Sequence, residues 1–193
     1  MEMVIMPFRL KDLQNKKIDF RTLCFICCGM KVENGSIASV KYRELPFEDY
    51  SLKDNSTFKK RLNEMLKVDD RVLDYYAKEN IFNITVDYSN SDVILLRVPK
   101  STLKNLIINY DSNTIKTYLY LSYVLKYGPK IITQSEICKQ VGINSPTTIR
   151  EKLRILVDEG LIKREKVQVK KTVDRNNIIP SNYKTLEYKY ELV

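Results

Sequence analysis

The stretch Ile132–Glu165 reads ITQSEICKQVGINSPTTIREKLRILVDEGLIKRE and decides how the C-terminal half of the chain folds. A short helix is expected to begin after Thr133, whose hydroxyl can cap its first turn. Gly142 is expected to end it, because glycine adopts a left-handed backbone without steric cost. Ser145 can cap a second helix over Pro146–Glu159, where proline at the first turn removes only an N–H that has no helical partner. The stretch therefore predicts two helices joined by a tight glycine turn.

The second predicted helix has an apolar face and a polar face. Apolar side chains recur at helical spacing and are expected to face the core: Ile149, Leu153, Leu156 and Val157. Hydroxyl and charged side chains fall on the other face: Thr147, Thr148, Arg150, Glu151 and Arg154. Two helices joined in this way follow the helix-turn-helix plan, in which the N-terminal end of the second helix contacts base edges. Arginine can pair with guanine, and threonine can contact a phosphate or a thymine methyl group. The alternative is a solvated helix face that binds nothing.

The residues that follow predict a β-hairpin. Leu161–Lys170 is expected to be a strand, and Thr185–Leu192 alternates apolar and polar side chains as a half-buried strand does. The segment between them, Lys171–Lys184, contains the turn-forming residues Asp174 and Pro180. A hairpin with a basic tip is therefore expected after the second helix.

The quoted stretch, with its amphipathic helix running into DEGLI, resembles the helix-turn-helix and first wing strand of the winged-helix DNA-binding superfamily. The resemblance covers residues 113–193 and implies an α+β chain that ends in a winged helix of three helices plus a β-hairpin wing. It also implies double-stranded DNA as the partner. The DNA contacts that it implies lie on the second helix and on the hairpin: Ser145, Thr147, Thr148, Arg150, Arg154, Lys170, Lys171, Arg175 and Lys184.

The charge distribution supports a nucleic-acid partner. The chain of 193 residues carries a net charge of +9. Residues 113–193 hold 15 Lys and Arg against 8 Asp and Glu, while residues 1–112 hold 18 against 16. The positive excess therefore lies on the segment with the predicted helix-turn-helix, where it would attract phosphate and make binding depend strongly on salt.

Catalytic and metal-binding chemistry is not expected. The chain has no histidine, which removes the usual general base, and its 5 glycines form no phosphate-binding loop. Cys24, Cys27 and Cys28 lie in the apolar run TLCFICCGM, where thiols act as small buried hydrophobes, and Cys138 lies near an apolar helix face. We therefore expect no enzyme activity, no metal and no cofactor.

Two domains are predicted, an N-terminal α+β domain over residues 1–100 and the winged-helix domain over residues 101–193. In the first, a buried helix is expected over Ile18–Met30, with a strand as the alternative, and further helices over Ser56–Leu66 and Asp70–Glu79. Ile81–Tyr88 and Val93–Val98 are expected to pair as a hairpin. The order helix, helix, hairpin repeats that of the C-terminal half.

This repetition predicts a second winged helix in tandem with the first. Its DNA contacts would be the basic residues of the Ser56–Leu66 helix: Lys59, Lys60 and Arg61. The alternative is a solvated basic face on a domain that dimerises or regulates, and the near-neutral charge of this half favours that alternative. A second copy of the chain, in a homodimer, is therefore a further expected partner.

A tandem of winged helices resembles the replication initiators of plasmids and phages, and RVPKSTLKNLIINYDSNTIKTYLYLSYVLKYG (residues 97–128) resembles the corresponding part of replication proteins. The resemblance implies a sequence-specific double-stranded DNA-binding protein in transcription regulation or replication initiation. One alternative is a winged-helix module that binds a protein without reading DNA. Another is single-strand or RNA binding through tyrosines of the hairpin: Tyr183, Tyr188 and Tyr190. No long apolar segment or secretory signal is recognised, so a cytoplasmic protein without membrane partners is expected.

Overall fold

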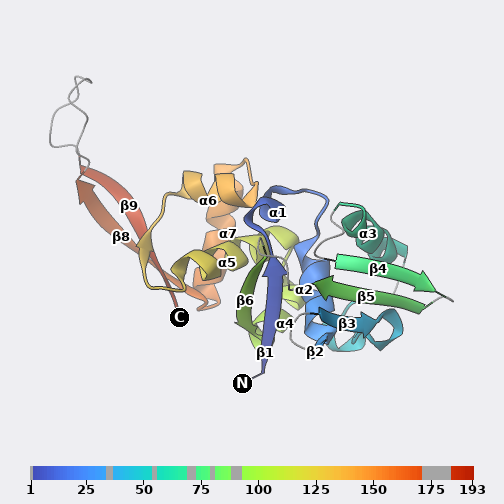
Figure 1. Ribbon diagram of the computed structural model, residues 1–193. Coiled ribbons are helices and arrows are strands. Elements are labelled where there is room, and N and C mark those ends of the chain that lie inside the picture. Colours follow the sequence, from blue (N-terminus) through green and yellow to red (C-terminus); the bar gives the residue numbers. More distant parts are fainter. Residues whose placement is uncertain are drawn as a thin grey trace.

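The computed structural model describes residues 2–33, 37–53, 56–68, 73–78, 81–87, 93–170 and 184–193. These residues form a mixed α+β structure, as expected, with antiparallel strands in three sheets. Figure 1 shows a four-stranded sheet at one end of the molecule and the β8–β9 hairpin projecting at the other, with most of the helices between them.

The N-terminal half alternates strands and helices. Its elements in chain order are β1 (Met3–Phe8), α1 (Leu10–Gln14), α2 (Phe20–Gly29), β2 (Lys31–Glu33), β3 (Ile37–Lys41), the 3-10 turns η1 (Tyr42–Glu44) and η2 (Glu48–Tyr50), α3 (Ser56–Leu66), β4 (Leu73–Lys78), β5 (Ile81–Asp87) and β6 (Ile94–Pro99). One sheet pairs β1 with β6, and the other has the order β2-β3-β5-β4.

Helix α2 is the buried helix predicted for this half. Asp19 caps it by accepting a hydrogen bond from the Arg21 N–H. The helix packs against β1, α3, α4 and α5. Within it, Phe25 is fully buried and its ring lies 5.1 Å from that of Phe47 and 5.6 Å from that of Phe58, centroid to centroid. The Phe25–Phe58 contact is edge-on and joins α2 to α3, whereas Phe47, just before η2, meets Phe25 at a tilted angle.

Two predictions for this half are wrong. The helix expected over Asp70–Glu79 is strand β4 where the structure describes it, because its Tyr75 and Tyr76 favour a strand and pair along β5. The hairpin between Ile81–Tyr88 and Val93–Val98 does not form, since β5 pairs with β3 and β4 while β6 pairs with β1. Among the residues described, the helix, helix, hairpin order that predicted a second winged helix is therefore missing.

The C-terminal half follows its predictions more closely. Its elements are α4 (Lys100–Asn109), α5 (Ser112–Leu125), β7 (Lys130–Ile131), α6 (Gln134–Val141), α7 (Pro146–Asp158), β8 (Ile162–Lys170) and β9 (Lys184–Leu192). Both helices of the quoted stretch and both following strands are confirmed, each within a residue or two of its expected bounds. The short strand β7 was not expected; it pairs with β9 and gives a sheet of order β7-β9-β8.

The two halves share one hydrophobic core. Its buried cluster includes Phe25 of α2, Leu103 of α4, Leu119 of α5 and Leu153 of α7. Helix α1 adds a second connection by packing against α6. Gly142, which ends α6, has a φ of 68° and lies so close to α1 that a Cβ there would stand 2.9 Å from the Cα of Gln14. The first helix is therefore fixed beside the turn that joins α6 to α7.

The cysteines differ in burial, which gives a direct test of this packing. Cys24, Cys27 and Cys28 of α2 are buried, and burial raises the pKa of each thiol, that of Cys28 to about 11. Cys138 of α6 is only half-buried.

In the native protein we expect Cys138 alone to react readily with a thiol-specific disulfide reagent at pH 8, because thiolate formation and access both limit the rate. The other three thiols should react at least about 100-fold more slowly, because the reagent reaches them only after local or global unfolding. Absorbance of the released thiol measures both phases, and full reaction in denaturant calibrates the total. Four equal rates in the native protein would contradict this packing of α2.

Candidate nucleic-acid interface

The helix caps and the turn of the α6–α7 unit are formed by residues close to one another in the sequence. The Thr133 hydroxyl accepts a hydrogen bond from the Glu136 N–H at 3.1 Å and caps α6. The Ser145 hydroxyl accepts one from the Thr148 N–H at 3.3 Å and caps α7. Gly142 lies between the two helices in the left-handed conformation. The predicted caps and glycine turn are therefore confirmed.

Helix α7 buries one face and exposes the other. Ile149, Leu153 and Leu156 have no exposed area, whereas Val157 is half-buried. The predicted DNA-contacting side chains of this helix are exposed except for Thr148, which is half-buried: Ser145, Thr147, Thr148, Arg150 and Arg154. The division of faces expected from the helical period is confirmed.

Two basic side chains of α7 have different roles. The Arg150 Nε donates to the Gln134 Oε1 of α6 at a long 3.4 Å, and the guanidinium stays exposed. Lys152, in contrast, is buried, and its Nζ lies 2.9 Å from the Asp111 carboxylate at the start of α5. Arg150 is therefore free to meet a ligand, while Lys152 fixes α7 on the rest of the fold.

The hairpin residues are only partly within the described structure. Lys170 and Lys184 pair with each other at the described ends of β8 and β9. The predicted contacts Lys171 and Arg175 lie outside the described residues, as does Tyr183.

The described hairpin tyrosines do not form an open stacking surface. Tyr190 is fully buried. Tyr188 is half-buried, and the Arg164 guanidinium lies 4.8 Å from the centre of its ring. Single-strand binding by stacking on these two rings is therefore disfavoured, because Tyr190 is buried and Arg164 lies over the half-buried ring of Tyr188.

The basic residues of α3 are exposed, but they do not act as one patch. Lys59 lies over the Tyr42 ring, 5.5 Å from its centre, and Lys60 is exposed. Arg61 forms an ion pair with Asp19 at 3.5 Å. Of the three, only Arg61 borders the same cavity as Ser145 and Thr148.

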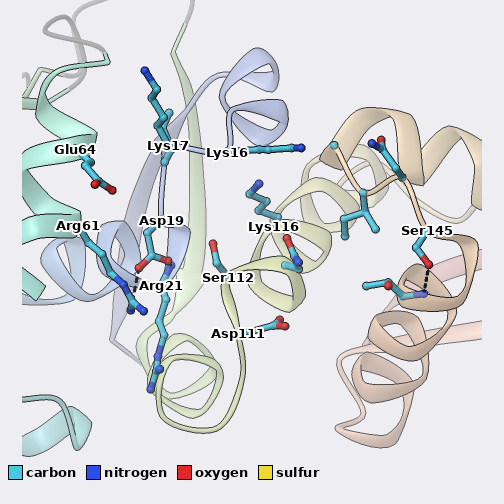
Figure 2. A pocket seen from close by; sticks show the side chains of 16 residues that line it. Lys16, Lys17, Asp19, Arg21, Arg61, Glu64, Asp111, Ser112, Lys116 and Ser145 are labelled. Carbon is cyan, nitrogen blue, oxygen red and sulfur yellow. Dashed lines mark hydrogen bonds and ion pairs between the residues drawn. The ribbon is translucent and has the colours of Figure 1, made fainter. Parts of the chain in front are cut away.

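That cavity is a cleft of about 770 Å³, which Figure 2 shows from close by. Its walls come from four places: the α1–α2 connection, α3, the start of α5 and the α6–α7 turn. Beside Arg61, its basic lining residues are Lys16, Lys17, Arg21 and Lys116. The sequence shows Lys16 and Lys17 as an adjacent basic pair, but the residues around them do not predict that they lie beside the turn before α7.

Within the described ranges, no helix is long and apolar enough to cross a bilayer. The same residues contain no cluster of three side chains suited to hold a metal ion. Comparison with protein-family models, with curated protein sequences and with solved structures gave no match.

Proposed function

We propose that residues 112–193 form a winged helix and that the protein binds double-stranded DNA in a sequence-specific manner. The observation that carries this proposal is the element order α5-β7-α6-α7-β8-β9, with a β7-β9-β8 sheet and an α7 whose outer face is polar, basic and exposed. In the helix-turn-helix arrangement, the second helix enters the major groove by its N-terminal part. Here that part is the first two turns of α7.

Each exposed group on α7 has a suitable partner on DNA. Arg150 can donate two parallel hydrogen bonds to a guanine edge, which discriminates that base pair from the other three. Ser145 and Thr147 can donate to phosphate oxygens or contact base edges, and the positive end of the helix dipole favours phosphate nearby. Arg154, one turn after Arg150, extends the same face.

The β8–β9 hairpin would act as the wing that holds the flanking backbone. It projects from the body of the molecule in Figure 1, and Lys163 and Lys166 of β8 are exposed. Such contacts neutralise phosphates without reading sequence, so they contribute affinity that falls with salt. We propose that this DNA binding serves transcription regulation or the initiation of plasmid or phage replication, in the cytoplasm.

Arg150→Ala is expected to reduce discrimination at one base pair by about 1–3 kcal/mol, because one bidentate contact is lost. The preferred site is first selected from a random duplex library with the wild-type protein. Titrations of that site and of a random duplex then give the specificity ratio at fixed salt.

Arg150→Lys is the matched control for charge. It keeps the positive charge but replaces the rigid planar guanidinium with a flexible ammonium, so it should bind random DNA like the wild type and lose part of the discrimination. Equal weakening of specific and random DNA in both variants would contradict base reading by Arg150. Failure of the wild-type protein to bind any duplex at low salt would leave the protein-interaction module as the function.

A further inference from the structure

We propose that the cleft between the α1–α2 connection and the α6–α7 turn binds a phosphate group, with Lys116 at its floor and Lys16 at its rim. In Figure 2 the Lys16 side chain reaches towards the turn before Ser145, and the Lys116 side chain points from α5 towards the Lys16–Lys17 segment; both line the cleft. The site adjoins the exposed face of α7 that would read bases, and Ser145 and Thr148 of the predicted DNA contacts also line it.

The main observation is a buried lysine side chain without an ion pair or hydrogen bond among the described residues. Lys116 of α5 is 5% exposed, and no described residue gives it a hydrogen bond or an ion pair. Its closest described aromatic contact is the Phe20 ring, 5.8 Å from the Nζ atom. An unpaired buried charge is unfavourable, so a fold that keeps one gains stability when an anion binds beside it.

The electrostatics around Lys116 agree with this interpretation. Burial lowers the pKa of Lys116, the negative charge of Asp19 opposes this, and the positive charge of Lys16 adds a smaller lowering. Lys16 and Lys116 line the same cleft and repel each other, although Asp19 offsets this repulsion. An anion between them would relieve the repulsion.

The acidic residues of the cleft are largely engaged elsewhere. Asp19 accepts hydrogen bonds from the Arg21 N–H and the Thr22 hydroxyl, and pairs with Arg61. Asp111 caps α5 and pairs with Lys152. Glu64 of α3 is the remaining carboxylate in the lining, opposed by the unpaired Lys16, Lys17 and Lys116.

The turn before α7 supplies the polar groups that a phosphate needs. Ser145 and Thr148 line the cleft, and the N-terminus of this 13-residue helix directs its positive dipole end towards it. Gly142 holds the segment that carries Lys16 against this turn. Lysine ammoniums, a hydroxyl and a helix N-terminus together form a set of donors that suits phosphate.

Two sources could supply the phosphate group: the DNA backbone next to α7, or a free phosphate-bearing ligand. The first source rests on the proposed function, and the second does not. Because both sources present the same phosphate group to the cleft, the experiment tests inorganic phosphate in one arm and duplex DNA in the other.

In the first arm, the protein is labelled with ¹³C at lysine Cε and titrated with inorganic phosphate, with sodium chloride used to match ionic strength. Phosphate should shift the Lys116 resonance and raise its pKa, because a bound anion favours the charged form. Lys116→Met should weaken phosphate binding at least about tenfold, since a charge-assisted hydrogen bond is lost. Lys126→Met removes an exposed lysine outside the cleft lining and should leave binding unchanged.

In the second arm, Lys16→Gln is compared with the wild type on a random duplex over a range of salt. If the DNA backbone enters the cleft, the salt slope should fall by about one. An unchanged slope, with weaker phosphate binding in the first arm, would assign the cleft to a free ligand. If the cleft is a phosphate site but the protein is not a DNA-binding protein, it should bind inorganic phosphate and no duplex DNA. If Lys116→Met and Lys16→Gln change neither phosphate binding nor the salt slope, the cleft is not a phosphate site.

Discussion

Gly142→Ala is expected to lower the free energy of unfolding by about 3 kcal/mol, through two separate costs. The first is backbone strain, because Gly142 has a φ of 68°, a conformation that disfavours any side chain with a Cβ. The second is steric, because the new Cβ would stand 2.9 Å from the Gln14 Cα and 3.2 Å from the Gln14 carbonyl oxygen. Both neighbours are backbone atoms, so relief requires α1 to move away from α6.

Gly160→Ala separates these two costs. Gly160 ends α7 with a φ of 66°, but a Cβ at this position meets no atom within 4 Å. This variant should therefore show the strain alone, about 1 kcal/mol. Urea denaturation followed by circular dichroism measures both variants. Equal losses would mean that α1 does not dock against the α6–α7 turn.

Gly142 also shows which part of the site the sequence predicts. Its role as the end of α6 follows from local rules, as do the caps at Thr133 and Ser145 and the buried face of α7. These features depend on residues within one or two turns of each other, where helical spacing and capping chemistry decide. The contact of Gly142 with Gln14 involves a segment near the other end of the chain, and the residues around Gly142 do not predict it.

The same limit explains the errors in the N-terminal half. The residues of β6 indicate a strand, but they do not indicate its partner. The nearest preceding strand in the sequence is β5, which pairs with β4, whereas β6 pairs with β1. Burial decides the pairing, because Val98 and Leu96 of β6 and Met6 and Phe8 of β1 all enter the core. Strand propensity does not specify a partner. The cleft around Lys116 was missed for the same reason, since its walls come from four separated segments.

Asp111→Ala is expected to lower the free energy of unfolding by about 2–3 kcal/mol, because it removes a helix cap and a charge partner together. The Asp111 carboxylate accepts from both the Thr114 N–H and its hydroxyl at 2.8 Å, and from the Lys152 Nζ at 2.9 Å. Without it, Lys152 retains only Glu151, at 3.4 Å. A largely buried ammonium would then lack its closest counter-charge, and the tie between α5 and α7 would weaken.

Asp111→Asn is the matched control, because asparagine caps helices as well as aspartate but carries no charge. It should lose about 1 kcal/mol, the modest value expected of an ion pair whose carboxylate side chain is 53% exposed to solvent. The difference between the two variants then measures the cap.

The pH dependence of the control isolates the charge. Burial tends to raise the pKa of Asp111, but the hydrogen bonds from Thr114 and Lys152 outweigh it and the pKa is lowered. A lowered pKa in the folded state stabilises the protein above the unfolded pKa of aspartate, about 4, and this stabilisation is lost as the pH falls through the folded value. The advantage of the wild type over Asp111→Asn should therefore be constant from pH 7 to about pH 5 and be lost as the pH falls through the lowered folded-state pKa. A difference that persists unchanged at pH 2 would show that Asp111 acts through the shape of its side chain. In that case the ion pair between Lys152 and Asp111 would not fix the position of α7 on α5.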